Sequence, residues 1–295
     1  PPLAGTARGA SPAEIAAELA TRVATYQNEA GESYFAASIQ PPADQALLDL
    51  LSQGPARLSI VVDTSASQVG AFRKDQFATL RGILSGLRPG DQVQLFAADV
   101  SVTPLSELIS ATDETAIAEA LAKLNRRLPL GNTNLNQALQ TAKSALQSGP
   151  KDETRSLIYI GDGASIELAA DEQAFESLVD SLRTDRIAVH SVAIGPSKNV
   201  ALLATLANQT GGELALVADG QADFASQLGK QVAAAATLSP IWVEEVTLPA
   251  GLQTIQAKRL PPLRLDRDSL LFGTAPTVQG DAVAGGTIEV IGRSA

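Results

Sequence analysis

The sequence lacks cysteine and methionine entirely, and it contains a single histidine among 295 residues. Without cysteine, the chain can form no disulfide, no thiolate metal site and no thiol nucleophile. A lone histidine also leaves few ways to build a histidine-based catalytic or zinc site. Because methionine is missing even at position 1, we expect that the sequence follows a processing event, such as removal of a signal peptide, or is a piece of a longer chain.

Aromatic residues are scarce, and acidic residues outnumber basic ones. Aromatics make up 4% of the chain, so aliphatic side chains must fill the core, for which a hydrophobic content of 45% is sufficient. The formal net charge of −10 argues against nucleic acid as a partner, because an acidic surface repels phosphates, and it is compatible with cation binding. No apolar run approaches the roughly 18 residues of a membrane span, so we expect none in this chain.

The middle of the chain alternates apolar strands with amphipathic helices. The runs LSIVVD (58–63), SLIYIGD (156–162) and IAVHSVAIG (187–195) are nearly continuous, as in parallel strands that are buried on both faces. Helical spacing of apolar residues lies between them, for example in 77–87. This alternation predicts an α/β fold with a doubly wound, mostly parallel sheet and helices on both faces.

Both ends of the chain have a different character. Ser11, Pro12 and Glu14 form a capping pattern that predicts a helix to about Tyr26, and a strand is expected at 32–39. After Leu238 the pattern consists of short strands separated by proline and glycine, in a segment too small for a core of its own. We therefore expect a smaller β-sandwich built from both chain ends, with boundaries at 1–51, 52–238 and 239–295.

Three loops of the predicted sheet carry small oxygen-bearing side chains. Asp63, Ser65 and Ser67 follow the first buried strand, Asp162 follows another, and Thr133 precedes a helix in LGNTNLNQAL. Because the carboxyl ends of parallel strands meet at one edge of a sheet, we expect these side chains to converge. Hydroxyl and carboxylate oxygens are hard ligands, which Mg²⁺ prefers. The pattern therefore predicts a metal site.

The pattern Asp63-x-Ser65-x-Ser67, Thr133 and Asp162-Gly163 resembles the metal-ion-dependent adhesion site of von Willebrand factor type A domains, over about residues 58–238. The resemblance implies that Ser65 and Ser67 bind the ion directly, that Thr133 does so in a high-affinity state, and that the two aspartates act mostly through waters. It implies Mg²⁺, with Mn²⁺ or Ca²⁺ as alternatives, and a partner's Asp or Glu in the remaining position. The expected β-sandwich is similar to that of secreted bacterial relatives of inter-alpha-trypsin inhibitor heavy chains.

The resemblance also extends to the last helix of the alternating region. Residues 221–238 match an element whose movement couples the metal site to the rest of the protein in some family members. The sequence does not say whether this helix moves here. The five site residues can also persist as loop structure without ever binding an external acid.

Other chemistries fit the sequence less well. A serine nucleophile needs a base, and the only histidine, His190, lies within a predicted strand, where we expect a packed residue. No nucleotide-binding glycine motif is present. Asp266 and Asp268 lack the further ligands of a calcium loop and are expected in a polar turn.

We therefore expect a non-enzymatic, extracytoplasmic module that binds a protein partner through a metal ion. The alternative is a structural subunit of a surface layer or filament, in which the fold assembles with copies of itself. A third hypothesis, a regulatory partner of an intracellular ATPase, is disfavoured by the predicted β-sandwich and by the absence of a neighbouring ATPase segment.

Overall fold

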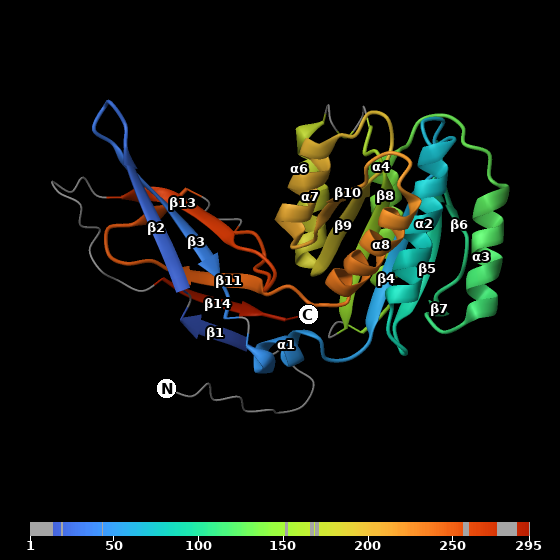
Figure 1. Ribbon diagram of the computed structural model, residues 1–295. Coiled ribbons are helices and arrows are strands. Elements are labelled where there is room, and N and C mark those ends of the chain that lie inside the picture. The colour runs from blue at the N-terminus through green and yellow to red at the C-terminus, as the bar shows by residue number, and fades with distance from the viewer. Residues whose placement is uncertain are drawn as a thin grey trace.

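A computed structural model describes residues 14–18, 20–42, 44–150, 153–165, 168, 171–255, 260–275 and 288–294. Figure 1 shows two parts, a large sheet flanked by helices and a smaller β-rich part beside it. None of the helices in the described ranges combines the length and apolar character needed to span a bilayer.

The large sheet has seven strands in the order β10-β9-β8-β4-β5-β6, with β7 also paired to β5. Its strands are β4 (Ala56–Asp63), β5 (Gln92–Ala98), β6 (Val102–Pro104), β7 (Ile109–Ser110), β8 (Thr154–Gly161), β9 (Ile187–Ala193) and β10 (Leu214–Leu216). The pairings from β10 to β5 are parallel, and only β6 and β7 run antiparallel to β5. The predicted doubly wound α/β fold with a mostly parallel sheet is confirmed.

Helices cover both faces of this sheet (Figure 1). They are α2 (Ala71–Gly86), α3 (Glu114–Arg126), α4 (Leu135–Leu146), α6 (Glu172–Thr184), α7 (Val200–Thr210) and α8 (Ala222–Ala236). The helices α2, α3 and α8 pack on one face and α4, α6 and α7 on the other, each through an aliphatic stripe. Side chains of Asp113, Asn134, Asp171 and Asn199 cap α3, α4, α6 and α7, which explains where these helices begin.

The helices α2 and α8 touch backbone to backbone. A Cβ atom on Gly82 would lie 2.1 Å from the carbonyl oxygen of Ser226, and one on Gly229 would lie 2.3 Å from that of Thr79. Side chains larger than hydrogen are excluded at both positions, so the two glycines fix how closely these helices approach. The helix α8 is thus packed directly on its neighbour.

The smaller part consists of two antiparallel sheets built from both chain ends, as predicted. One has the order β1-β14-β11 and the other β12-β13-β3-β2. Their strands are β1 (Glu14–Glu18), β2 (Ala20–Gln27), β3 (Ser33–Gln40), β11 (Trp242–Thr247), β12 (Gln253–Thr254), β13 (Ser269–Ala275) and β14 (Glu289–Arg293). Phe35, Leu271 and Val290 share one core with Leu47 of the short helix α1 (Gln45–Leu51). The exact domain boundaries stay a prediction.

The N-terminal helix predicted from the capping pattern is wrong. The described residues of this stretch form β1 and β2, and β2 pairs antiparallel with β3 from Ala20↔Gln40 to Gln27↔Ser33. A turn closed by hydrogen bonds between Asn28 and Glu32 joins the two strands. Tertiary pairing overrides the local helical signal, because β3 offers a complete ladder of partners and β2 has threonine and valine at alternate positions. Ser11 and Pro12 lie outside the described residues.

The two parts are joined where the chain crosses between them. The chain leaves the smaller part through α1 and enters β4, and it returns from α8 to β11. The backbone N–H of Ser239 donates to the carbonyl oxygen of Leu51 at 2.9 Å, so both crossings lie side by side. The buried Arg264 adds a further link, because its Nη1 donates to the Gly211 carbonyl at 3.0 Å.

His190 is fully buried in β9, as predicted. Neither ring nitrogen has a hydrogen-bond partner among the described residues. Burial, reinforced by the positive charges of Arg264 and Arg267, holds the pKa of His190 well below its usual value of 6.5. The folded protein therefore keeps this imidazole neutral at a pH at which the unfolded chain protonates it.

This difference in protonation predicts a pH dependence of stability. Above pH 6.5 both states carry a neutral His190, whereas below it only the unfolded state binds the proton. The free energy of unfolding should therefore fall by up to about 1.4 kcal/mol per pH unit as the pH drops below about 6. His190→Leu should reduce the pH dependence of the free energy of unfolding, measured with urea, because His190 is the only side chain of this sequence whose usual pKa lies between pH 5 and 8. An equal slope of the free energy of unfolding against pH in the parent protein and the variant would contradict the assignment of this pH dependence to His190.

Candidate functional site

The five residues singled out in the sequence meet at one edge of the large sheet. Asp63 is the last residue of β4, and Asp162 directly follows β8, its parallel neighbour. Ser65 and Ser67 lie in the loop between β4 and α2, and Thr133 lies in the loop between α3 and α4. The two carboxylates are buried, as are Ser65 and Thr133, and Ser67 is half-buried.

Hydrogen bonds join these side chains to one another. Thr133 Oγ1 donates to Asp63 Oδ1 at 2.7 Å, and the backbone N–H of Ser65 donates to the same oxygen at 2.8 Å. Ser67 Oγ donates to Asp162 Oδ2 at 2.6 Å and lies 3.0 Å from Ser65 Oγ. Side chains from three loops therefore present their oxygens within one small volume.

Tyr159 is a site residue that the sequence analysis missed. From within β8, its hydroxyl donates to Asp63 Oδ2 at 2.7 Å and accepts from the backbone N–H of Gly163 at 3.2 Å. Gly161 makes this approach possible, because a Cβ atom there would lie 2.5 Å from the Tyr159 hydroxyl. A tyrosine in a fully buried strand needs a polar partner, and that was the signal available in the sequence.

Gln68 is a second residue that sequence reasoning did not find. Its buried amide nitrogen lies 3.1 Å from Asp162 Oδ2, 3.1 Å from Ser67 Oγ and 3.2 Å from the carbonyl oxygen of Ile194. The amide therefore ties the β4–α2 loop to the chain that follows β9. Asp162 Oδ1 accepts from the backbone N–H of Ala164 at 2.9 Å, so both oxygens of this carboxylate are oriented.

The loop that carries Thr133 is held on both sides by backbone hydrogen bonds. Leu130 N donates to the Thr64 oxygen at 3.1 Å, Ala66 N donates to that of Gly131 at 2.9 Å, and Asn134 N donates to that of Asp99 at 2.9 Å. Asp99 Oδ2 also accepts from the side chains of Thr64 and Arg127. The position of the Thr133 hydroxyl is thus fixed by contacts to both neighbouring loops.

The electrostatics of the site favour a cation. Among the described residues, neither Asp63 nor Asp162 takes part in an ion pair. Burial raises the pKa of the Asp63 carboxyl, although hydrogen bonds from Thr133, Ser65 and Tyr159 oppose this effect. Burial, together with the charges of Asp63 and Asp162, places the pKa of Tyr159 well above its usual value of 10.0. The site holds negative charge that no nearby basic side chain compensates.

The serines of the site lie away from the only histidine, and their hydroxyls contact one another and a carboxylate. The Ser65 and Ser67 hydroxyls hydrogen-bond to each other, and Ser67 also donates to Asp162, whereas His190 lies opposite Ile158 within the sheet, away from its carboxyl edge. Within the described part of the chain, no cluster of three or more histidine and acidic side chains is placed to hold a metal. Most ligands of an ion at this edge would therefore be hydroxyl oxygens.

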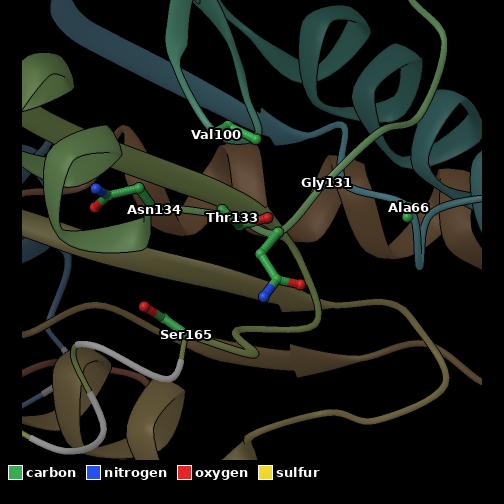
Figure 2. A pocket seen from close by; sticks show the side chains of 7 residues that line it. Ala66, Val100, Gly131, Thr133, Asn134 and Ser165 are labelled. Carbon is green, nitrogen blue, oxygen red and sulfur yellow. The ribbon is translucent and has the colours of Figure 1, made fainter.

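A hollow of about 730 Å³ opens beside Thr133 (Figure 2). Figure 2 shows Val100 and Ser165 on opposite sides of Thr133, on separate loops. The residues that line the hollow are Ala66, Val100, Gly131, Asn132, Thr133, Asn134 and Ser165. None of them is charged, so an occupant meets amides, hydroxyls and aliphatic groups.

Comparison with known proteins agrees with this geometry. Residues 56–216 match the family model described as the von Willebrand factor type A domain. The mouse (Mus musculus) inter-alpha-trypsin inhibitor heavy chain H2 is 29% identical over 183 residues, and the human (Homo sapiens) protein is 27% identical over 189. These matches cover 60% and 62% of this chain, but only about a fifth of each relative, 19% and 20%.

Solved structures resemble both parts of the fold. A von Willebrand factor type A protein from Catenulispora acidiphila aligns with a TM-score of 0.60 and 14% identity, over 97% of this chain and 66% of its own. The ArnB paralog VWA2 from Sulfolobus acidocaldarius aligns with a TM-score of 0.54 and 16% identity, over 94% of this chain and 75% of its own. At such identities the likeness concerns the fold alone.

The role of Tyr159 can be tested through stability. Tyr159→Phe removes the donor to Asp63 Oδ2 and leaves a buried carboxylate oxygen without a partner, which should lower the free energy of unfolding by about 1–3 kcal/mol. Urea unfolding of the metal-free protein measures the change. Tyr34→Phe is the matched control, because the Tyr34 hydroxyl bonds to Glu32 at an exposed site and its loss should have little effect. Equal effects of both variants would contradict a special role for Tyr159.

Proposed function

The chain belongs to the von Willebrand factor type A domain family, and on that premise we propose that its site binds a divalent metal ion and, through it, a carboxylate of a partner protein. Domains of this family are usually binding modules without catalytic activity, and their fold often binds a divalent metal. The observation that carries the proposal is the convergence of five oxygen-bearing side chains from three loops, with no basic side chain among the described residues paired to their carboxylates.

The donor set fits a hard cation such as Mg²⁺. The hydroxyls of Ser65, Ser67 and Thr133 are neutral oxygen ligands within one small volume, and Mg²⁺ prefers oxygen. A bound ion supplies Lewis acidity that attracts an anionic oxygen from outside. The two carboxylates formally neutralise a divalent ion. Their oxygens also accept hydrogen bonds from Thr133, Tyr159 and Ser67, which draws part of their negative charge away from the ion.

Asp63 has a positioning role in this proposal. Both of its oxygens already accept hydrogen bonds, Oδ1 from Ser65 and Thr133 and Oδ2 from Tyr159. The carboxylate therefore holds the Thr133 hydroxyl in place and makes the local electrostatic potential more negative. It acts on the ion without binding it directly. Gln68 has the corresponding role for Asp162 and Ser67.

The proposal extends to the partner and the location. The hollow beside Thr133 is open and has an uncharged lining, so a carboxylate that enters it finds no acidic lining residue to repel it. We further propose an extracytoplasmic location, which the resemblance to secreted bacterial relatives of inter-alpha-trypsin inhibitor heavy chains supports. Fractionation of cells that express the full-length protein tests the location directly.

Metal binding can be measured by calorimetric titration of Mg²⁺, and then Mn²⁺, into metal-stripped protein. We expect saturable binding at one site. Thr133→Ala and Asp162→Asn should each weaken it at least about tenfold, because each removes an oxygen ligand or a group that orients one.

Asp113→Asn is the matched control for these titrations. It makes the same change of charge at an exposed N-cap, where asparagine caps as well as aspartate, so the affinity for Mg²⁺ should be unchanged. Circular dichroism verifies that all variants keep the fold. Absence of saturable binding to the parent protein, or equal binding by the Asp162→Asn variant, would refute the proposed metal site.

A further inference from the structure

Large apolar side chains surround the candidate site and point to solvent. Val69 is 52% exposed, Val100 68%, Leu128 75% and Leu130 64%. These four residues, which we call the apolar rim, lie on the three loops that follow β4, β5 and α3. Single exposed aliphatic residues are common on protein surfaces, but a group of them around one polar hollow marks an interaction surface.

The apolar rim is tied structurally to the site residues. Val100 lines the hollow beside Thr133, and a Cβ atom on Gly131 would lie 2.4 Å from Val100 Cγ2. The Leu130 backbone N–H donates to Thr64, which lies between Asp63 and Ser65. Val69 directly follows Gln68, whose amide contacts Asp162. A molecule in the hollow therefore contacts Val100, and the other rim residues lie on loops that carry or hold the site residues.

Two charged residues near the rim, Arg127 and Asp99, are engaged with each other. Arg127 and Asp99 form a half-buried ion pair with each other, and Arg127 also donates to the Thr103 hydroxyl. The residues that line the hollow carry no charge. The hollow therefore offers a partner one point of strong electrostatic attraction, the proposed metal, and otherwise uncharged contacts.

We propose that the apolar rim selects a carboxylate flanked by bulky apolar groups, so that the partner presents a single acidic residue within an apolar surface rather than an acidic cluster. This inference rests on the proposed function and specifies its partner. Apolar contacts around the carboxylate exclude water from it, and a polar contact that is shielded from water is stronger. The net charge of −10 would in addition repel a strongly acidic partner.

Small carboxylates can stand in for the protein partner in a test of this inference. Acetate, 3-methylbutanoate and 3-phenylpropanoate carry the same charged group with increasing apolar area. Titrated into the protein saturated with Mg²⁺, 3-phenylpropanoate should bind at least about tenfold more tightly than acetate, because its ring rests on the rim. A chelator should abolish the binding of all three.

Variants of the rim separate its contribution from that of the metal. Val100→Ser combined with Leu130→Ser should remove the advantage of 3-phenylpropanoate over acetate and leave the Mg²⁺ affinity unchanged, since neither side chain supplies an oxygen ligand. Leu270→Ser is the matched control, because Leu270 is 50% exposed on β13 in the smaller part of the protein. This control should keep the full advantage.

The outcomes are distinguishable. Equal affinities of the parent protein for acetate and 3-phenylpropanoate would overturn the role of the rim, as would an advantage that survives in the double variant. Binding of Mg²⁺ without any binding of carboxylates would overturn the proposed function itself, and this inference with it.

Discussion

The candidate site depends on the burial of one carboxylate, Asp63, at the end of the central strand of the sheet. Its two oxygens accept hydrogen bonds from Ser65 in its own loop, from Thr133 on a distant loop and from Tyr159 on the neighbouring strand. Burying a charge is costly unless hydrogen bonds or an opposite charge compensate it. Compensation here is incomplete, because burial raises the pKa of this carboxyl in spite of its partners. In the proposed function, a bound cation would offset this residual cost.

The scaffold around this carboxylate is rigid where the chemistry needs it. Parallel strands place Asp63 and Asp162 side by side, and backbone hydrogen bonds from Leu130, Ala66 and Asn134 fix the loop that carries Thr133. On one face of the sheet, contacts at glycines hold α8 directly against α2. The proposed ligands are therefore held in place without an ion, which would reduce the entropy lost if one binds. The side chains of the exposed rim are free to differ in composition, because Leu130 contributes to these contacts only through its backbone N–H.

Several features could be predicted from the sequence because they depend on strand order and chain direction. Continuous apolar runs identified the parallel strands, and the edge where they end placed Asp63, Thr133 and Asp162 together. Tyr159 and Gln68 were missed because their partners lie across the sheet, and local patterns carry no information on such pairs. The predicted helix that ends near Tyr26 failed for a related reason, since β3 provides a ladder of hydrogen bonds that outweighs a local capping signal.

The two ends of β4 have different neighbours, and this has a mechanical consequence. Its carboxyl end carries Asp63, and its amino end connects through 52–55 to α1 and the smaller part of the protein (Figure 1). Tension between a partner held at the site and an anchor on the smaller part would run along this strand. Its hydrogen bonds to β5 and β8 lie across that direction and would bear the load together. Such shear loading requires many bonds to break at once, so this strand would resist the tension better than one whose bonds are opened singly.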